Sequence, residues 1–436
     1  MKRVFSVTAA SLLLFAAGPS LAAGFRIVEQ DNAAQSMAHA VTAGVSDASA
    51  VYYNPAAMTE LGAYAAKVGV QVIDPKTDFA GSGANAGFSS RSTANTSYAV
   101  PNLYMVKNLG DSGVAVGLGL FSNFGLGTTW SIEGPFRYVA TDSQLSTSTV
   151  TVNVAKKLGD MLSLAVGLDY LTARGKLDSM YPFAFFEPGA ADGYLNLRGT
   201  GSGFGFNAAA LLRPADSVRV GLAYRSRIKT TLSGDLELQN LPGTLAPLMG
   251  AGSVAGADYK TSSSLDITFP DIVTFGVAVK VTEALSVEGG IDYTLWSTYD
   301  KQTVKNDRPL LLPNGVAVIP AEQTTRKDWK DTLAVRVGGA YALSPATTLR
   351  AGYYFDPTPV PEETFDPRMP DATRNGLCLG VGYKATDRFS VDFAYAYIWS
   401  DTRTVNNEVG ANTRSSVDGD YQNKAQVYGL SFGYAM

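Results

Sequence analysis

The side chains that most often carry catalysis or bind metals are scarce in this sequence. His39 is its single histidine and Cys378 its single cysteine. A histidine acts as a general base only when a partner nucleophile lies within hydrogen-bond reach, and nothing in the sequence around His39 points to one. Structural zinc sites need several cysteine or histidine ligands, and one cysteine excludes an internal disulfide. We therefore expect no catalytic residue, no metal and no cofactor, which argues against an enzyme.

Charged side chains instead recur on one side of an alternating pattern. In the segment 161–173, Leu164, Val166 and Leu168 alternate with small residues and with Asp169. Such an alternation predicts a β-strand with one apolar and one polar face. The charged residues on the polar side of such segments are Asp169, Arg219, Arg225, Lys280, Glu288, Asp292, Arg336, Arg350 and Asp392. We interpret them as a charge network inside the fold, with ligand binding by Arg225 or Arg336 as the alternative.

The apolar faces of these strands require a partner, which is either a second sheet or lipid. Aromatic residues gather near one end of the apolar faces, as they do at the head-group level of outer-membrane barrels. The polar faces would then line a lumen, since backbone at membrane depth has to pair in a closed ring. The chain holds 44 Gly, 22 Tyr and 20 Phe, while only 17% of its residues are charged. This composition favours a closed, all-β transmembrane barrel.

Fourteen segments carry the alternation, and the connections between them alternate between short and long. The segments lie near 63–73, 97–108, 113–122, 146–158, 161–173, 203–213, 216–228, 270–281, 284–297, 329–343, 347–356, 375–385, 388–400 and 423–435. The long connections lie near 74–96, 123–145, 174–202, 229–269, 298–328, 357–374 and 401–422. Short periplasmic turns and long outer loops are typical of outer-membrane barrels. We predict a 14-stranded antiparallel barrel over residues 63–436.

Residues 1–22 predict export from the cytoplasm. Two basic residues precede the apolar run 4–17, and small residues permit cleavage after Ala22. Since the run is too short to span a bilayer, we interpret it as a secretory signal peptide. The net charge is −4, and no basic patch suits nucleic acid. We expect a monomer in the bacterial outer membrane, surrounded by lipid and without a nucleic-acid partner.

The segment 23–62 lacks the alternation and is rich in small residues. It lies between the predicted cleavage site and the first predicted strand, and we interpret it as a hatch that plugs the lumen. Within it, Tyr52-Tyr53-Asn54-Pro55 is expected to form the turn that seats the hatch, and Asn54, Pro55 and Ala56 are its candidate site residues. The physical reason is that Pro55 restricts Asn54 to an extended conformation.

Two of the long loops contain apolar stretches, at 180–197 and 241–249. Their large apolar residues include Phe183, Phe185, Phe186, Leu245, Leu248 and Met249. Exposed loops are usually polar, so apolar outer loops suggest contact with an apolar ligand. The alternative is that the loops fold over the barrel mouth and bury one another, and the two interpretations are compatible.

The C-terminal third carries a more specific pattern. It comprises Trp329-Lys330-Asp331-Thr332, Leu349-Arg350-Ala351-Gly352, Thr358-Pro359-Val360-Pro361 and Gly380-Val381-Gly382-Tyr383-Lys384. This pattern closely resembles the FadL/TodX-type family of outer-membrane long-chain fatty acid transport proteins. Further matching motifs are Tyr224-Arg225-Ser226, Ser122-Asn123-Phe124-Gly125 and Asn54-Pro55-Ala56. The resemblance therefore covers nearly the whole mature chain.

The resemblance implies a 14-stranded barrel with an N-terminal hatch, and a route for hydrophobic molecules. Family members catch such ligands in a groove of outer loops and pass them to an inner pocket. The ligand then leaves sideways at a kink in the third strand. In this chain the loops 174–202 and 229–269 match the groove, and Ser122, Asn123, Phe124 and Gly125 match the kink.

One departure from the family bears on the ligand. Members that take fatty acids place basic residues in the inner pocket, where this chain has Ser179 and Thr325. Arg326 follows directly and could substitute, so we expect Arg225, Arg326 and Arg336 as polar head-group contacts. Long-chain fatty acids are the expected ligands. The alternatives are aromatic or alkane hydrocarbons, or a surface adhesin whose loops bind other cells.

Overall fold

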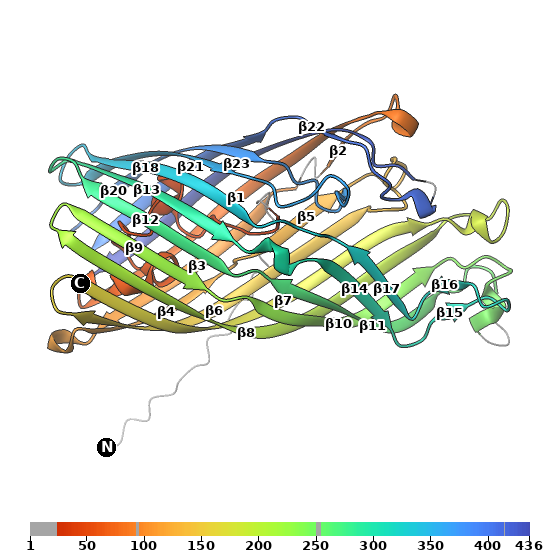
Figure 1. Cartoon of the computed structure of the whole chain (residues 1–436), viewed down its shortest axis with the longest axis horizontal. Coiled ribbons are helices and arrows are strands. Elements are labelled where there is room, and N and C mark those ends of the chain that lie inside the picture. The colour runs from red at the N-terminus through yellow and green to blue at the C-terminus, as the bar shows by residue number, and fades with distance from the viewer. Residues whose placement is uncertain (1–23, 93–95, 250–253, 414) are drawn as a thin grey trace, which may run out of the picture.

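The computed structural model describes residues 24–92, 96–249, 254–413 and 415–436, so the predicted signal peptide lies outside the described residues. These residues form a closed antiparallel barrel of tilted strands (Figure 1). Long hairpins gather at one end of the barrel, and the C-terminus lies at the other. None of the helices in the described ranges has the length and apolar character needed to cross a membrane.

The barrel wall consists of fourteen antiparallel strands, five of which are interrupted. The uninterrupted strands are β1 (Tyr64–Gly81), β3 (Tyr98–Asn108), β6 (Asp142–Leu158), β7 (Leu162–Tyr181), β8 (Gly193–Ala215), β19 (Thr347–Asp356), β20 (Arg374–Lys384), β21 (Phe389–Ser400) and β23 (Gly419–Ala435). The interrupted strands are β4 (Val114–Phe121) with β5 (Gly125–Thr129), β9 (Val218–Arg225) with β10 (Ile228–Gln239), β12 (Ile272–Lys280) with β11 (Tyr259–Phe269), β13 (Leu285–Thr294) with β14 (Lys301–Asn306), and β18 (Thr332–Ala342) with β17 (Glu322–Arg326).

Closure of the ring comes from the pairing of the first and last strands. β1 pairs with β23 along its length, from the partners Ala65 and Ala435 at one end to Gly81 and Gly419 at the other. On its other side β1 pairs with β3. Each remaining wall strand pairs with neighbours on both sides, which leaves no long open edge to the lipid. The predicted 14-stranded antiparallel barrel is therefore confirmed. Short strands outside the wall are β2 (Ser89–Ser92), β15 (Leu310–Leu311), β16 (Ala317–Ile319) and β22 (Arg403–Val405).

The two faces of the wall have the predicted chemistry. Val166 and Leu168 point outward and are 66% and 57% exposed, whereas Asp169 is fully buried in the interior. The outward apolar band ends at aromatic residues such as Tyr170 and Phe204, whose rings lie 4.9 Å apart. Beyond these rings β1, β7, β8 and β23 continue with polar outward faces. The sequence alternation fades at that level, so the predicted strands are shorter than the observed ones.

Four of the five interruptions were not predicted from the sequence, while the one between β4 and β5 lies where the family resemblance implied a kink. Strands β10, β11, β14 and β17 lie within the predicted loops 229–269 and 298–328, where they extend the wall beyond the apolar band. At the interruptions the chain leaves the sheet for a few residues, so the inward and outward positions shift. Trp329 thereby turns inward, out of step with the inward residues of β18, and it is buried beside Trp296 of the short helix η6 (Trp296–Thr298).

The N-terminal segment, Gly24–Gly62, is packed against the inner faces of wall strands. It contains α1 (Asn32–Ser36), α2 (Ala50–Tyr53) and the 3₁₀ helix η1 (Pro55–Glu60). Asp31 caps α1 by accepting a hydrogen bond from the N–H of Ala34 at 3.0 Å. Glu288 of the wall accepts hydrogen bonds from the N–H groups of Ala43 and Gly44, both at 2.7 Å. In Figure 1 this segment appears as red and orange coils inside the ring of strands.

Lys67 of β1 is the main ionic link between this segment and the wall. Its Nζ atom lies 2.7 Å from Asp31 Oδ1, 2.6 Å from Asp47 Oδ2 and 3.0 Å from Asp392 Oδ2. Asp31 and Asp47 belong to the N-terminal segment, and Asp392 belongs to β21. Since the Lys67 side chain is almost completely buried, its loss would leave Asp31 and Asp47 without their cation and Asp392 with Arg350 alone.

We predict that Lys67→Met destabilises the protein strongly. Breaking a buried ion pair by removing one partner costs about 3–5 kcal/mol. Thermal unfolding of the purified protein in detergent, and proteolysis within residues 24–62, measure the effect. Lys76→Met is the matched control, since the ion pair of Lys76 with Asp74 is partly exposed and worth about 0–1 kcal/mol. Equal stability of the two variants would contradict the central role of Lys67.

Candidate functional site

An aromatic cluster surrounds Phe25 near the start of the N-terminal segment. The ring of Phe25 lies 4.7 Å from Trp296, 5.3 Å from Tyr299 and 5.4 Å from Trp329, measured between centroids. Phe124 and Phe269 complete the cluster at 5.9 and 6.0 Å. The five rings around Phe25 come from residues in or next to four of the wall interruptions. The cluster therefore depends on the places where the wall strands are interrupted.

Gly24 is required next to this cluster. Its φ angle is +62°, a conformation that side chains disfavour. A Cβ atom at this position would lie 2.6 Å from Trp329 and 2.7 Å from Trp296. Only glycine therefore lets the chain enter between the two tryptophans and deliver Phe25 to the cluster.

An apolar cavity of about 840 Å³, counting the part open to solvent, lies against Phe25. Its apolar lining includes Leu145, Leu177, Leu197, Leu232, Leu265 and Ile267. These side chains come from β6, β7, β8, β10 and β11. With Phe25 in place only about 80 Å³ of this space is free to hold a small molecule, and its leucine-rich lining suits a hydrocarbon chain.

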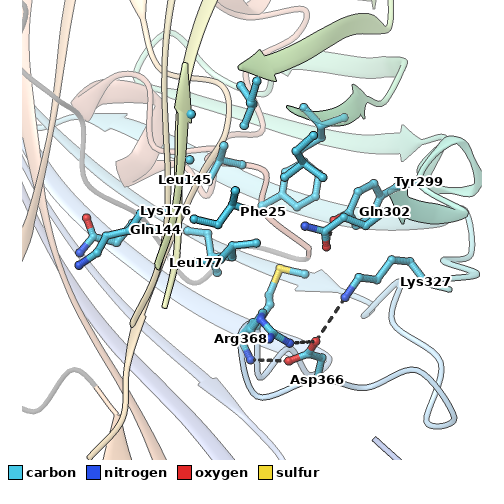
Figure 2. A pocket seen from close by; sticks show the side chains of 18 of the residues that line it. Phe25, Gln144, Leu145, Lys176, Leu177, Tyr299, Gln302, Lys327, Asp366 and Arg368 are labelled. Atoms are coloured by element: carbon cyan, nitrogen blue, oxygen red, sulfur yellow. Dashed lines mark hydrogen bonds and ion pairs between the residues drawn. The ribbon is translucent and has the colours of Figure 1, made fainter. Parts of the chain in front are cut away.

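A charged group borders the cavity, as Figure 2 shows. Asp366 Oδ2 lies 2.8 Å from Arg368 NH1 and 3.4 Å from Lys327 Nζ. Lys327 and Asp366 are each only 7% exposed. Two cations thus face one carboxylate beside an apolar cavity, which leaves a net positive charge there.

The pKa values follow from burial and from this pairing. Burial alone would raise the pKa of Asp366, but Arg368 and Lys327 outweigh it and lower that pKa to about 2. Burial lowers the pKa of Lys327, and the nearby Asp366 offsets only part of this effect. A second anion beside Lys327 would favour its charged form.

The three arginines predicted as head-group contacts lie elsewhere. Arg225 pairs with Asp169 at 2.5 Å, and Arg336 pairs with Asp292 at 2.9 Å; neither lines the cavity. The Arg326 side chain is 80% exposed and pairs with Asp328. Lys327, directly after Arg326, is one of the cations that do border the cavity. Sequence reasoning missed it because the interruption between β17 and β18 changes which side chains point inward.

Four of the six predicted capture residues form part of an apolar cluster at the loop end of the barrel. Phe183 and Leu245 are buried in it, together with Leu238 and Ile319. Phe186 and Leu248 are partly buried against the cluster, and Phe185 is 41% exposed. Met249 ends the short helix η5 (Ala246–Met249). The loops therefore bury one another in this structure, which was one of the two compatible interpretations.

The residues Ser122–Phe124 separate β4 from β5, and the N-terminal segment completes the wall there. The N–H of Ile27 donates to Asn123 O, and the N–H of Gly125 donates to Phe25 O, both at 2.8 Å. β4 pairs with β3 only as far as Leu120–Leu103. Within the described residues, no pairing links β5 to residues 98–102 of β3, so the ladder is open at this point.

The Asn54-Pro55-Ala56 motif fixes the end of the N-terminal segment. Asn54 Oδ1 accepts from the N–H of Ala56 at 3.1 Å, and Pro55 is the first residue of η1. Asn54 Nδ2 donates to Thr42 O at 2.7 Å and to Ala210 O of β8 at 3.1 Å. One side chain thus caps a helix and links it to the wall.

Comparison with known proteins gives relatives along the full length of the chain. A putative outer membrane protein of Neisseria meningitidis is 27% identical, over 96% of both chains. The long-chain fatty acid transport protein of Escherichia coli O6:H1 is 25% identical, over 95% of this chain and 94% of that protein. Outer membrane protein P1 of Haemophilus influenzae is 24% identical over the whole of both chains.

Solved structures share the fold. A FadL homologue of Pseudomonas aeruginosa superposes with a TM-score of 0.80 at 23% identity, covering 95% of this chain and all of that one. The toluene transporter TbuX of Ralstonia pickettii gives 0.68 at 16% identity, covering 94% and 99%.

The family model described as outer membrane protein transport protein (OMPP1/FadL/TodX) matches residues 13–436. A match of this extent, on a closed barrel with an apolar outer band, places the protein in the outer membrane. The chain belongs to the OMPP1/FadL/TodX family of outer-membrane proteins that transport hydrophobic compounds.

Proposed function

We propose that this protein takes up long-chain fatty acids across the outer membrane, without catalysis. The observation that carries this proposal is the excess cation beside the apolar cavity. Each methylene that an acyl chain buries contributes about 0.8 kcal/mol, which the leucine-lined cavity can supply. A buried carboxylate also needs a partner, and Lys327 with Arg368 provides it. A hydrocarbon would leave the excess positive charge without an anion.

Entry from outside would begin at the predicted capture residues Phe183, Phe185, Phe186, Leu245, Leu248 and Met249, of which Phe183, Phe186, Leu245 and Leu248 belong to the apolar loop cluster. Phe185 is the exposed member, so it would make the first contact. The buried members would become available only when the two loops separate. Since their contacts are side-chain packing on short irregular segments, such opening costs less than disruption of the wall.

Exit would run sideways through the open ladder between β3 and β5. An acyl chain crossing a water-filled pore would lose the contribution of each buried methylene, whereas lateral release moves it from the cavity into lipid. The N-terminal segment would act as the hatch. Displacing Phe25 enlarges the cavity and also removes the hydrogen bonds that Phe25 and Ile27 make to the Ser122–Gly125 region.

We predict that Lys327→Gln weakens oleate binding by about 10- to 100-fold. Hydrogen bonds to charged groups contribute about 1.5–3 kcal/mol, which corresponds to this range. Affinity of the purified protein for oleate, measured by calorimetry, gives the readout. Arg326→Gln is the matched control, because it removes the neighbouring but exposed cation.

Toluene and hexadecane are the second arm of this experiment. Their affinity should change little in Lys327→Gln, because neither molecule carries a charge. Equal oleate affinity in the two variants would refute the head-group assignment. Tighter toluene than oleate binding by the wild-type protein would favour the hydrocarbon alternative.

If the ligand leaves sideways between β3 and β5, a disulfide bond that joins the two strands across this unpaired stretch should stop uptake. Pro101→Cys with Ser122→Cys places thiols on the two sides of the opening, at positions that would face each other if the β3–β4 register continued past Leu103–Leu120. Oxidised cells carrying this pair should lose uptake of labelled oleate, and reduction should restore it. Met105→Cys with Leu118→Cys is the control, because these residues are already register partners. Full uptake by the oxidised first pair would exclude this exit.

A further inference from the structure

A polar groove lies on the outer surface of the barrel, directly above the apolar band. It has a volume of about 930 Å³, counting the part open to solvent. Its lining includes the hydroxyl side chains Ser146, Ser148, Thr172, Thr200 and Ser202, together with Arg174. The strand register places these residues in two adjacent rows, Ser146–Arg174–Thr200 and Ser148–Thr172–Ser202. Three strands, β6, β7 and β8, therefore contribute to one continuous polar surface.

The residues at the edge of the groove nearest the apolar band show where the groove lies relative to the membrane. Tyr170 lines the groove, and its register partner on β8 is Phe204. This pair is the next outward-facing row after Thr172 and Ser202, on the side of the apolar band. Phe204, Leu168 and Val166 are among the most exposed apolar side chains of the described residues, at 67%, 57% and 66%. Aromatic rings of this kind mark the head-group level. A lipid head group in the groove would thus keep its acyl chains against β7 and β8.

One cation that lines the groove and one beside it lack the acid partners that Lys176 and Lys260 have. Arg174 and Lys229 are exposed, and neither makes an ion pair or side-chain hydrogen bond with any residue in the described ranges. Lys229 lies beside the groove, since a Cβ atom on Gly203 would come within 2.5 Å of Lys229 O. By contrast, Lys176 pairs with Asp142 at 2.5 Å and Lys260 pairs with Asp235 at 3.0 Å.

We propose that this groove binds a phosphorylated, acylated sugar lipid of the outer leaflet. A guanidinium group binds phosphate in a bidentate manner, and an ammonium group adds a point charge. Rows of hydroxyl groups can donate and accept hydrogen bonds with the hydroxyls of a sugar. A phospholipid head group would satisfy the cations but would leave most of these hydroxyls to water. The groove therefore favours the glycolipid.

The test compares lipid binding by the full-length protein in detergent, with native mass spectrometry as the readout. The probes are a diphosphorylated acylated disaccharide, its dephosphorylated form and phosphatidylglycerol. We expect the phosphorylated disaccharide lipid to bind most tightly. Arg174→Gln and Lys229→Gln should each weaken it about fivefold, because one cation near a membrane surface contributes about that factor. Thr172→Val with Ser202→Ala should weaken the glycolipid but not phosphatidylglycerol.

Lys260→Gln is the matched control, since it removes an outward cation that already has an acid partner. It should leave glycolipid binding within twofold of the wild-type value. Equal binding of the dephosphorylated lipid or of phosphatidylglycerol would overturn the proposal, and so would an equal loss in Lys260→Gln. Oleate affinity serves as the folding check. Because the groove lies on the opposite side of the wall from Lys327, this affinity should stay unchanged in every variant.

Discussion

Most charges inside this barrel meet an opposite charge from another part of the chain, because an unpaired buried charge is costly. Lys67 draws two carboxylates from the N-terminal segment and one from β21. Arg26 of the N-terminal segment shares Asp292 with Arg336 of the wall. In each case the partners come from different parts of the chain. The location of the N-terminal segment therefore follows from the pairing that the inner face of the wall demands.

That location also shapes the cavity and the wall beside it. The ion pair of Arg26 with Asp292, 3.0 Å long, holds the residue after Phe25. Phe25 thereby fills the aromatic cluster, while its carbonyl group and the N–H of Ile27 occupy the gap in the β4–β5 strand. One short stretch thus borders the ligand cavity and closes the sheet. A molecule that moves Phe25 would change the wall at the same time, which gives a physical link between loading and release.

The alternation of residues such as Leu168 and Asp169 was enough to predict the barrel, because lipid and lumen impose opposite chemistry on neighbouring positions. The interruptions could not be predicted in this way. Trp296 and Trp329 look like ordinary strand residues, and nothing local shows that the chain leaves the sheet there. The same shift affects the head-group prediction: Arg326 was proposed because it follows Thr325, whereas the cation that points inward is the next residue, Lys327. Arg225 and Arg336 were correctly placed on the polar face, and their acid partners, Asp169 and Asp292, lie on other strands.

The contacts of the N-terminal segment also constrain the order of assembly. Its residues leave the ribosome first, yet Lys67 joins Asp31 to Asp392, and Gln35 donates to Val427 O at 3.4 Å. These partners lie more than three hundred residues downstream, on β21 and β23. Contacts of such high sequence separation form late. The N-terminal segment can therefore reach its final position only after β21 and β23 have joined the barrel. Closing of the barrel and filling of its interior then occur in the same last step of folding.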